Sequence, residues 1–173
     1  LENGAHVLRL QGADVIRCVK ERKNVTVIGL IKARYSDSDV YITPTSQEVR
    51  TLLETGCEII ALDGTDRPRP GGDTLSTLVQ QVHLANRLVM ADCDSVESVM
   101  FSLAAGADII STTLSGYTAQ SKTPSGPDLD LVREAAKIAP LVIAEGRYAE
   151  PWQVWAALRA GAQGVVIGGS IND

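Results

Sequence analysis

Several apolar runs of this sequence end on ionisable side chains, and the combination of those side chains could move protons. The run that begins at Val25 ends on Lys32. Other runs close on Arg9, Asp63, Asp92 and Glu145. An unbroken apolar run is typical of a parallel strand buried on both faces, and a half-desolvated lysine at the end of such a strand can act as a base. A lysine with carboxylates and an arginine favours a proton-transfer, imine-forming or sugar-binding site.

The elements that must position these side chains alternate along the chain. Seven apolar runs cover residues 6–10, 25–32, 58–63, 88–92, 108–114, 141–145 and 164–167. Between them, helix starts are predicted by a capping box at Thr45 and Glu48, by Asp94 with Glu97, and by first-turn prolines at 127 and 151. Alternating strands and helices predict a parallel α/β fold.

A glycine recurs where a helix meets the next strand. The repeated positions are Gly4, Gly56, Gly106 and Gly161. Their spacing of about 50 residues indicates a unit of two strands and two helices, and four such units make an eight-stranded TIM barrel. We expect residues 1–173 to form a single barrel domain with seven visible parallel strands, which lacks the first β/α unit and the last helix. The rival is an open doubly wound sheet.

Glycine-rich loops near the end of the chain are suited to an anion. Gly168 and Gly169 follow the last apolar run, and Arg147 lies in the loop before it. Backbone amides at such glycines can bind a phosphate, and TIM barrels bind phosphate after their seventh and eighth strands. In the loop after the fifth run, Thr113 and Tyr117 are candidates for substrate contact, although a rim position suits Tyr117 equally well.

Composition limits the partners. The net charge of -5 argues against nucleic acid or an anionic membrane surface. The three cysteines and two distant histidines form neither a disulfide framework nor a metal pattern, so we expect no metal and a cytoplasmic protein. Trp152 and Trp155 lie three apart on a predicted helix, where packing or a subunit contact, as in a homodimer, is favoured over ligand stacking.

Six sequence blocks resemble those of the N-acetylmannosamine-6-phosphate 2-epimerases. They are Ile28-Gly-Leu-Ile-Lys-Ala-Arg34, Ile42-Thr-Pro-Thr45, Ile60-Ala-Leu-Asp-Gly-Thr-Asp-Arg-Pro-Arg-Pro70, Ser111-Thr-Thr-Leu-Ser-Gly-Tyr-Thr118, Ile143-Ala-Glu-Gly-Arg147 and Val166-Ile-Gly-Gly169. The resemblance implies a bacterial TIM-barrel isomerase of amino-sugar and sialic acid catabolism. Such an enzyme interconverts N-acetylmannosamine 6-phosphate and N-acetylglucosamine 6-phosphate without a metal or redox cofactor.

The same resemblance implies roles for individual residues. It assigns the catalytic lysine to Lys32, the active-site glutamate to Glu145, an aspartate to Asp92 and a sugar-contacting arginine to Arg9. It assigns the phosphate-binding segment to Gly168 and Gly169, with Arg147 nearby. Family members also begin with a strand and helix and end in a helix that this chain lacks.

These roles fit epimerisation at C2 of an open-chain sugar. Lys32 would remove the C2 proton and return it to the other face, while Glu145 would exchange a proton with O1 or O5. Asp92 would orient Lys32 or bind a hydroxyl. For Asp63, a loop-fixing ion pair and a substrate contact are both open.

The sequence leaves two alternatives to an epimerase open. In a lysine-imine aldolase or synthase on the same barrel, Lys32 would attack a carbonyl carbon instead of removing a proton. The chain could also be an inactive fragment or remnant that only binds sugar phosphate.

Overall fold

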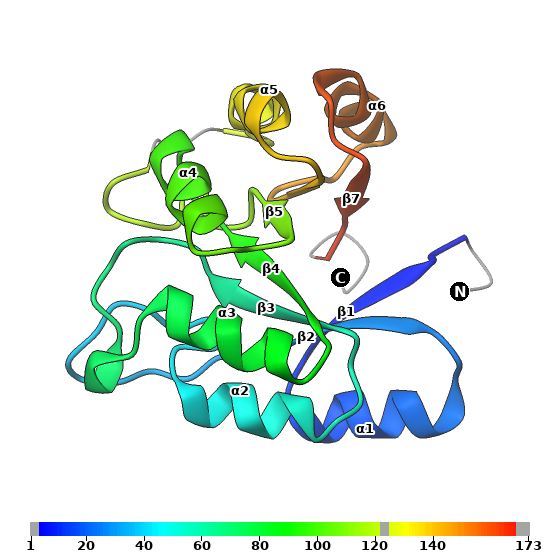
Figure 1. Cartoon of the computed structure of the whole chain (residues 1–173). Helices are drawn as coiled ribbons and strands as arrows, with labels where there is room; N and C mark the ends of the chain where they lie inside the picture. Colours follow the sequence, from blue (N-terminus) through cyan, green and yellow to red (C-terminus); the bar gives the residue numbers. More distant parts are fainter. Residues whose placement is uncertain (1–3, 122–124, 169–173) are drawn as a thin grey trace. The chain divides into compact units, whose positions relative to one another are not determined.

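The computed structural model describes residues 4–121 and 125–168 as alternating strands and helices (Figure 1). Each of the seven predicted apolar runs contains or overlaps one strand. In chain order the elements are β1 (Val7–Gln11), α1 (Ala13–Arg22), β2 (Thr26–Leu30), α2 (Ser46–Leu53), β3 (Ile59–Asp63), the 3-10 turn η1 (Pro70–Gly72), α3 (Leu75–Leu84), β4 (Leu88–Asp92), α4 (Val96–Ala104), β5 (Ile109–Ser111), α5 (Leu129–Ile138), β6 (Val142–Glu145), α6 (Pro151–Ala160) and β7 (Gly164–Val166).

The chain forms two compact units, Leu1–Met90 and Ala91–Asp173, and each is described by itself. The strand order follows the sequence, with β1-β2-β3 in the first unit and β5-β6-β7 in the second, and the unit boundary falls within β4. The ladders β1–β2, β2–β3, β5–β6 and β6–β7 are parallel. The prediction of a single domain stays a prediction.

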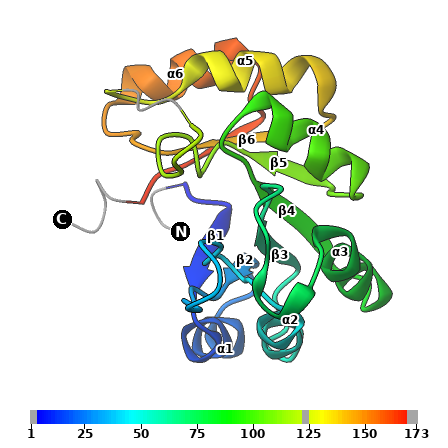
Figure 2. The same ribbon diagram turned by 90° about the vertical axis from the view of Figure 1, so that its left-hand side faces the viewer.

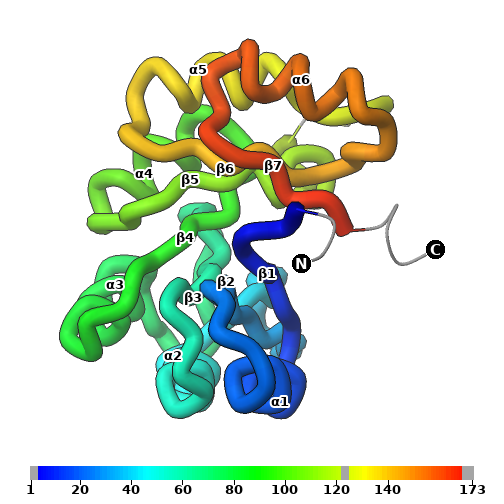
Figure 3. The backbone as a smooth tube through the Cα atoms, turned by 90° about the vertical axis from the view of Figure 1, so that its right-hand side faces the viewer, coloured from blue at the N-terminus to red at the C-terminus, as the bar shows by residue number. Residues whose placement is uncertain are grey.

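The helices of each unit cover one face of its strands. Figures 1 and 2 show α1, α2 and α3 on the same face of the first unit's strands. Figure 3 shows α5 and α6 on one face of β6 and β7. A doubly wound sheet reverses its strand order and carries helices on both faces. Sequential strands with helices on one face are instead the pattern of a barrel.

The core of the first unit leaves no room for a side chain at Gly29 of β2. A Cβ atom there would lie 2.9 Å from Cys57 Sγ, 3.0 Å from Ile16 Cδ1 and 3.2 Å from Leu52 Cδ2. These three side chains are fully buried. The missing side chain therefore lets α1 and α2 pack closely on the strand.

Local helix signals were correct in part. Thr45 caps α2, with the predicted capping box to Glu48, and Pro151 is the first residue of α6. The cap of α4 is Ser95 rather than the expected Asp94. Ser95 instead forms a capping box with Ser98, and the Asp94 carboxylate accepts a hydrogen bond from Thr118 Oγ1 at 2.5 Å. Pro127 lies ahead of the N-cap Asp128 instead of in the first turn of α5.

The repeated glycines have the conformation that the repeat predicts. Gly56, Gly106 and Gly161 follow helices with φ of 81°, 96° and 113°, and Gly4 has φ 89°. This left-handed region is open to glycine without steric cost. Among the described residues, none of the helices combines the length and apolar character needed to cross a bilayer.

An ion pair joins α1 to the residue just before β3. Lys20 Nζ donates to Glu58 Oε1 and to the Val25 carbonyl at 3.1 Å, and the Val27 N–H donates to Glu58 Oε2 at 2.9 Å. Burial by itself would raise the pKa of Glu58, but the hydrogen bonds from Lys20 and Val27 outweigh it and lower the pKa overall. The carboxylate form thus stabilises the fold.

We predict that Glu58→Gln lowers the free energy of unfolding at pH 7 by about 1 kcal/mol, a value kept small because the pair is partly exposed. A lowered folded-state pKa gives stability above the unfolded-state value of about 4.3 that is lost as the pH falls through the folded-state pKa. Urea unfolding at pH 7 and below pH 4 should show the gap between variant and parent closing in acid. Glu134→Gln, which breaks an exposed pair with Lys137, is the control; an equal loss in both variants would contradict the prediction.

Candidate functional site

Lys32 lies two residues beyond β2, in a loop segment whose backbone is held by hydrogen bonds. It forms an isolated antiparallel bridge with Ile42. The Thr43 N–H donates to the Ile31 carbonyl at 2.7 Å, and the Ile31 N–H donates to Thr43 Oγ1 at 3.2 Å. Thr43 is buried and has φ 44°, a strained value for a β-branched residue. These bonds fix the direction in which Lys32 leaves the strand.

The environment of Lys32 differs from the expected one. The sequence predicted a half-desolvated lysine, whereas the residue is exposed in the structure. The reason is that β2 ends at Leu30, so that Lys32 already belongs to the loop. Arg9 also departs from its expected place, because it is the middle residue of β1 instead of the last. It pairs in register with Ile28, and its Nη1 lies 3.7 Å from Met90 Sδ.

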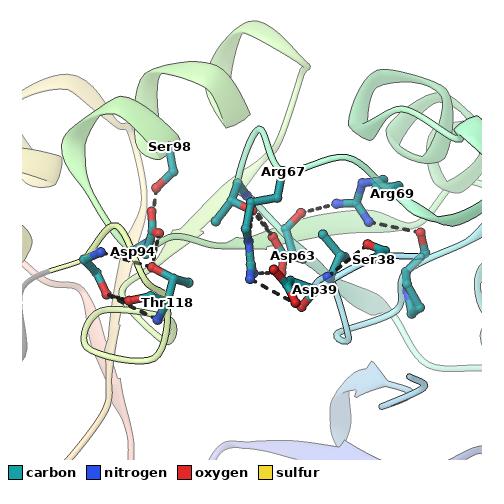
Figure 4. Close-up of polar contacts among 12 residues, drawn as sticks. Ser38, Asp39, Asp63, Arg67, Arg69, Asp94, Ser98 and Thr118 are labelled. Carbon is teal, nitrogen blue, oxygen red and sulfur yellow. Dashed lines mark hydrogen bonds and ion pairs between the residues drawn. The ribbon is translucent and has the colours of Figure 1, made fainter. Parts of the chain in front are cut away.

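Arg69 connects the loop after β2 to the end of β3. Its guanidinium is buried and donates to the carbonyl oxygens of Asp63, Pro44 (3.3 Å) and Thr43 (3.5 Å) (Figure 4). Burial lowers the pKa of Arg69, and the negative charges of Asp63 and Asp73 oppose that change. Arg69 therefore holds the loop segment that bonds to the backbone beside Lys32.

Asp63, the last residue of β3, has both carboxylate oxygens engaged. Oδ1 accepts from the Thr65 N–H at 3.0 Å and from Thr65 Oγ1 at 2.6 Å, and Oδ2 pairs with Arg67 Nη2 at 2.6 Å (Figure 4). Burial raises the pKa of Asp63, while the Thr65 hydrogen bonds and the Arg67 charge oppose the rise. Arg67 also donates to the Asp39 carbonyl at 3.3 Å. These contacts support the loop-fixing role, and substrate contact by Asp63 stays a prediction.

In the second unit the structure brings together Asp92, Thr113 and Glu145. Asp92 and Glu145 are the last residues of β4 and β6, and Thr113 lies two residues past β5. Thr113 Oγ1 is 2.8 Å from Asp92 Oδ1 and 3.1 Å from Glu145 Oε2. Asp92 is buried, and the other two residues are half-buried. A hydroxyl thus joins the two carboxylates that were predicted to be catalytic.

Arg147 is fixed by the loop that follows β5. Its Nε donates to the Gly126 carbonyl and its Nη1 to the Ser115 carbonyl, each at 2.8 Å. Its guanidinium carbon lies 5.3 Å from the centre of the exposed Tyr117 ring. With φ 60°, Arg147 adopts a backbone conformation that is rare outside glycine. Neighbouring contacts therefore hold this arginine in a defined position.

The remaining phosphate candidates lie after β7. In the β6–β7 ladder Glu145 pairs with Val166, and Arg147 and Gly168 each lie two residues beyond this last pair in the sequence. Gly168 is exposed, and a Cβ atom added there would have no heavy atom within 4 Å. Gly169 lies outside the described residues. Phosphate binding by these three residues stays a prediction.

Two residues that support the site, Arg69 and Ser111, carry no signal of their own in the sequence. Arg69 belongs to the block Arg67-Pro-Arg69-Pro70, and Ser111 begins another block. Both are buried. A buried polar side chain must be hydrogen-bonded, but the sequence does not show which polar residues will be buried.

The buried cysteines are poorly suited to thiol chemistry, and the described residues hold no group of metal ligands. Burial raises the pKa of the Cys93 thiol to about 12, so that it stays protonated and unreactive at neutral pH. Cys57 is buried as well, and burial raises its pKa, whereas Cys18 is exposed. Within residues 4–121 and 125–168, no three His, Cys, Asp or Glu side chains are grouped so that they could hold a metal ion.

Comparisons with known proteins agree on one family. The family model described as "Putative N-acetylmannosamine-6-phosphate epimerase" (NanE) matches residues 1–173. A "Putative N-acetylmannosamine-6-phosphate 2-epimerase" of Clostridium perfringens strain SM101 is 44% identical over 172 residues, which are 99% of this chain and 78% of the relative. The "Bifunctional enzyme NanE/NanK" of Brucella melitensis is 43% identical over 170 residues, which are 98% of this chain and 32% of that enzyme.

A solved structure gives the same result for the fold. The N-acetylmannosamine-6-phosphate 2-epimerase from Clostridium perfringens matches with a TM-score of 0.96 and 43% identity, over 98% of this chain and 75% of that chain. The match confirms the predicted TIM-barrel class, here with seven strands in the described residues.

The buried Arg69 network leads to a stability prediction. Arg69→Met leaves the three buried carbonyls without their donor, and we expect it to lower the free energy of unfolding by about 2–4 kcal/mol. Arg50→Met removes an exposed arginine that bonds only to its own helix and should cost at most about 0.5 kcal/mol. Urea unfolding followed by tryptophan fluorescence measures both. Similar losses in the two variants would show that the Arg69 network contributes little.

Proposed function

The chain belongs to the N-acetylmannosamine-6-phosphate epimerase family, and we propose on this basis that it interconverts N-acetylmannosamine 6-phosphate and N-acetylglucosamine 6-phosphate. The observation that carries the proposal is the 44% identity over 99% of the chain with a relative named for this reaction. The two sugars differ only in the configuration at C2. The enzyme must therefore remove the C2 proton from one face and supply a proton to the other.

In the proposed reaction Lys32 is the base. C2 of the open-chain sugar lies next to the C1 aldehyde, which acidifies its proton. Lys32 takes this proton, a planar enediolate-like intermediate forms, and the lysine returns a proton to the opposite face. The backbone bonds of Ile31 and Thr43 support this role, because they hold the lysine's starting point still while its long side chain reaches the sugar.

The other residues handle oxygen atoms and the phosphate. Glu145 exchanges a proton with O1 or O5 as the ring opens and closes, and Asp92 orients the base or binds a hydroxyl. Arg9, Tyr117 and Asp63 are the further sugar contacts in this proposal. For Thr113, which the sequence predicted as a sugar contact, the hydrogen bonds to Asp92 and Glu145 favour a role through these carboxyl groups.

Arg147, Gly168 and Gly169 bind the phosphate in this proposal. An arginine carries five N–H donors, and the bonds of Arg147 to Gly126 and Ser115 use two of them. Anchoring the phosphate, which does not react, would use binding energy to orient the reacting carbon.

The proposal extends to the setting of the enzyme. The described cysteines are free thiols, which fits a reducing compartment such as the cytoplasm. Trp152 and Trp155 are 62% and 69% exposed on α6. Two large exposed aromatic side chains on one helix suit a subunit contact, and we infer a homodimer.

Proton NMR in deuterated water tests the lysine base. The chain should convert N-acetylmannosamine 6-phosphate and incorporate deuterium at C2. Lys32→Ala should lose exchange by at least about 100-fold, the lower range for a general base. Lys137→Ala, which changes an exposed lysine on α5, is the matched control and should keep the parent rate.

Two results would contradict this mechanism. Exchange by Lys32→Ala at the parent rate would show that another group is the base. Borohydride reduction in the presence of the sugar phosphate would reveal an imine as a covalent mass increase on Lys32. Such an adduct would favour the aldolase or synthase alternative.

A further inference from the structure

The hydroxyl of Thr113 has more partners than it has protons. Its Oγ1 lies 2.7 Å from Ser111 Oγ, 2.8 Å from Asp92 Oδ1 and 3.1 Å from Glu145 Oε2. A hydroxyl has one proton to donate and two lone pairs that accept. Ionised carboxylates only accept, so Thr113 can donate to Asp92 or to Glu145, but not to both at once.

The three bonds are satisfied together when one of the carboxyl groups carries a proton. Ser111 then donates to one lone pair of Thr113, the protonated carboxyl donates to the other, and Thr113 donates to the remaining carboxylate. Rotation of the Thr113 hydroxyl exchanges the roles of Asp92 and Glu145. No proton needs to leave Thr113 for this exchange.

The surrounding backbone holds the hydroxyl between its partners. Ser111 is fully buried at the end of β5, and its carbonyl accepts from the Cys93 N–H at 2.7 Å. Thr112 Oγ1 donates to the Glu145 carbonyl at 2.9 Å and accepts from the Glu145 N–H at 3.0 Å. The Leu114 N–H donates to the Cys93 carbonyl at 3.1 Å. The segment that carries Thr113 is therefore bonded to the strands on both of its sides.

We propose that Thr113 is a positioning residue, whose hydroxyl switches between Glu145 and Asp92 as Glu145 gains and loses its proton. This inference rests on the proposed function, in which Glu145 exchanges a proton with O1 or O5 of the sugar. Thr113 donates to Glu145 while that group is a carboxylate, and turns to Asp92 when Glu145 is protonated. Each protonation state of Glu145 thus keeps a hydrogen bond, and Ser111 supports the hydroxyl in both.

Other charged groups of the second unit are occupied around this cluster. Asp94 accepts from Thr118, Asp128 accepts from Ser115, and Arg147 donates to the Ser115 and Gly126 carbonyls. Among the described residues of the second unit, the ionisable side chains hydrogen-bonded to Thr113 are Asp92 from β4 and Glu145 from β6. A change at Thr113 should therefore act first on these two groups.

The test compares Thr113→Val, which keeps the shape and removes the hydroxyl, with Thr113→Ser, which keeps the hydroxyl. Thr113→Val should lower kcat by about 10- to 100-fold, the size expected for a lost hydrogen bond to a charged group, with little change in KM. Its kcat/KM profile should lose activity at a higher pH on the acid side, because a carboxylate without its donor has a higher pKa. Thr113→Ser should restore both, and Ser111→Ala should show a smaller effect in the same direction.

The control is Thr51→Val, which removes an exposed hydroxyl on α2 bonded only to the Gln47 carbonyl, and it should behave like the parent. If Thr113→Val matches the parent in kcat and pH profile, the proposal is wrong. A raised KM with unchanged kcat would overturn it in favour of direct substrate binding. Should Thr113→Val fail to fold, the Ser111→Ala and Thr113→Ser profiles decide in its place.

A second measurement separates this proposal from the proposed function. Carbon-13 NMR of labelled Glu carboxyl groups, recorded without substrate, follows the titration of Glu145 directly. Thr113→Val should raise the pKa of Glu145 relative to the parent, because the carboxylate loses a hydrogen-bond donor, whether or not the chain epimerises the sugar. Unchanged titration would overturn the positioning role, and absence of C2 exchange in the parent would overturn only the proposed function.

Discussion

The positions of the two main catalytic candidates depend on the same kind of hydrogen bond, from a threonine side chain to the backbone at a strand end. Thr43 Oγ1 accepts from the Ile31 N–H beside Lys32, and Thr112 Oγ1 bonds to both backbone groups of Glu145. At these points the regular ladders end, and backbone groups without partners would be costly if buried. The hydroxyls continue the pairing into the loops, so each candidate leaves its strand in a defined direction.

The loops of the first unit are held by buried charged groups as well as by buried apolar side chains such as Val40 and Ile42. Asp63 pairs with Arg67, and Arg69 binds carbonyls from two segments. Taking charges out of water is expensive, and the cost is offset only where the hydrogen-bonding groups are satisfied. The hydrogen bonds of Arg69 make the loop beside Lys32 stiff. A stiff loop suits a reaction in which one base must serve both faces of a carbon atom, because the base moves through its side chain and the backbone stays still.

In the second unit a shared hydroxyl links Asp92 and Glu145. One oxygen of each carboxyl group lies within hydrogen-bond distance of Thr113 Oγ1. In the proposed function the two carboxyl groups therefore act together, with the threonine between them and the buried Ser111 behind it.

The sequence by itself determined the features that depend on neighbours along the chain. The seven apolar runs, the glycine joints with positive φ and the cap of α2 by Thr45 all follow from local signals. Local signals were ambiguous where two neighbouring residues could cap a helix: Ser95 caps α4 with Ser98, and the carboxylate of Asp94 binds Thr118. The named family came from specific residue blocks and not from periodicity.

Only the tertiary structure decided which polar groups meet. Thr113 reaches Asp92 and Glu145, 21 and 32 residues away, and the parallel pairing of β5 with β6, in which Ser111 lies opposite Ile143, brings the ends of these two strands together. Register depends on long-range pairing and packing, which a single sequence does not display. The burial of Arg69 and the shared hydroxyl that links the two carboxylates likewise depend on residues that are distant in the sequence.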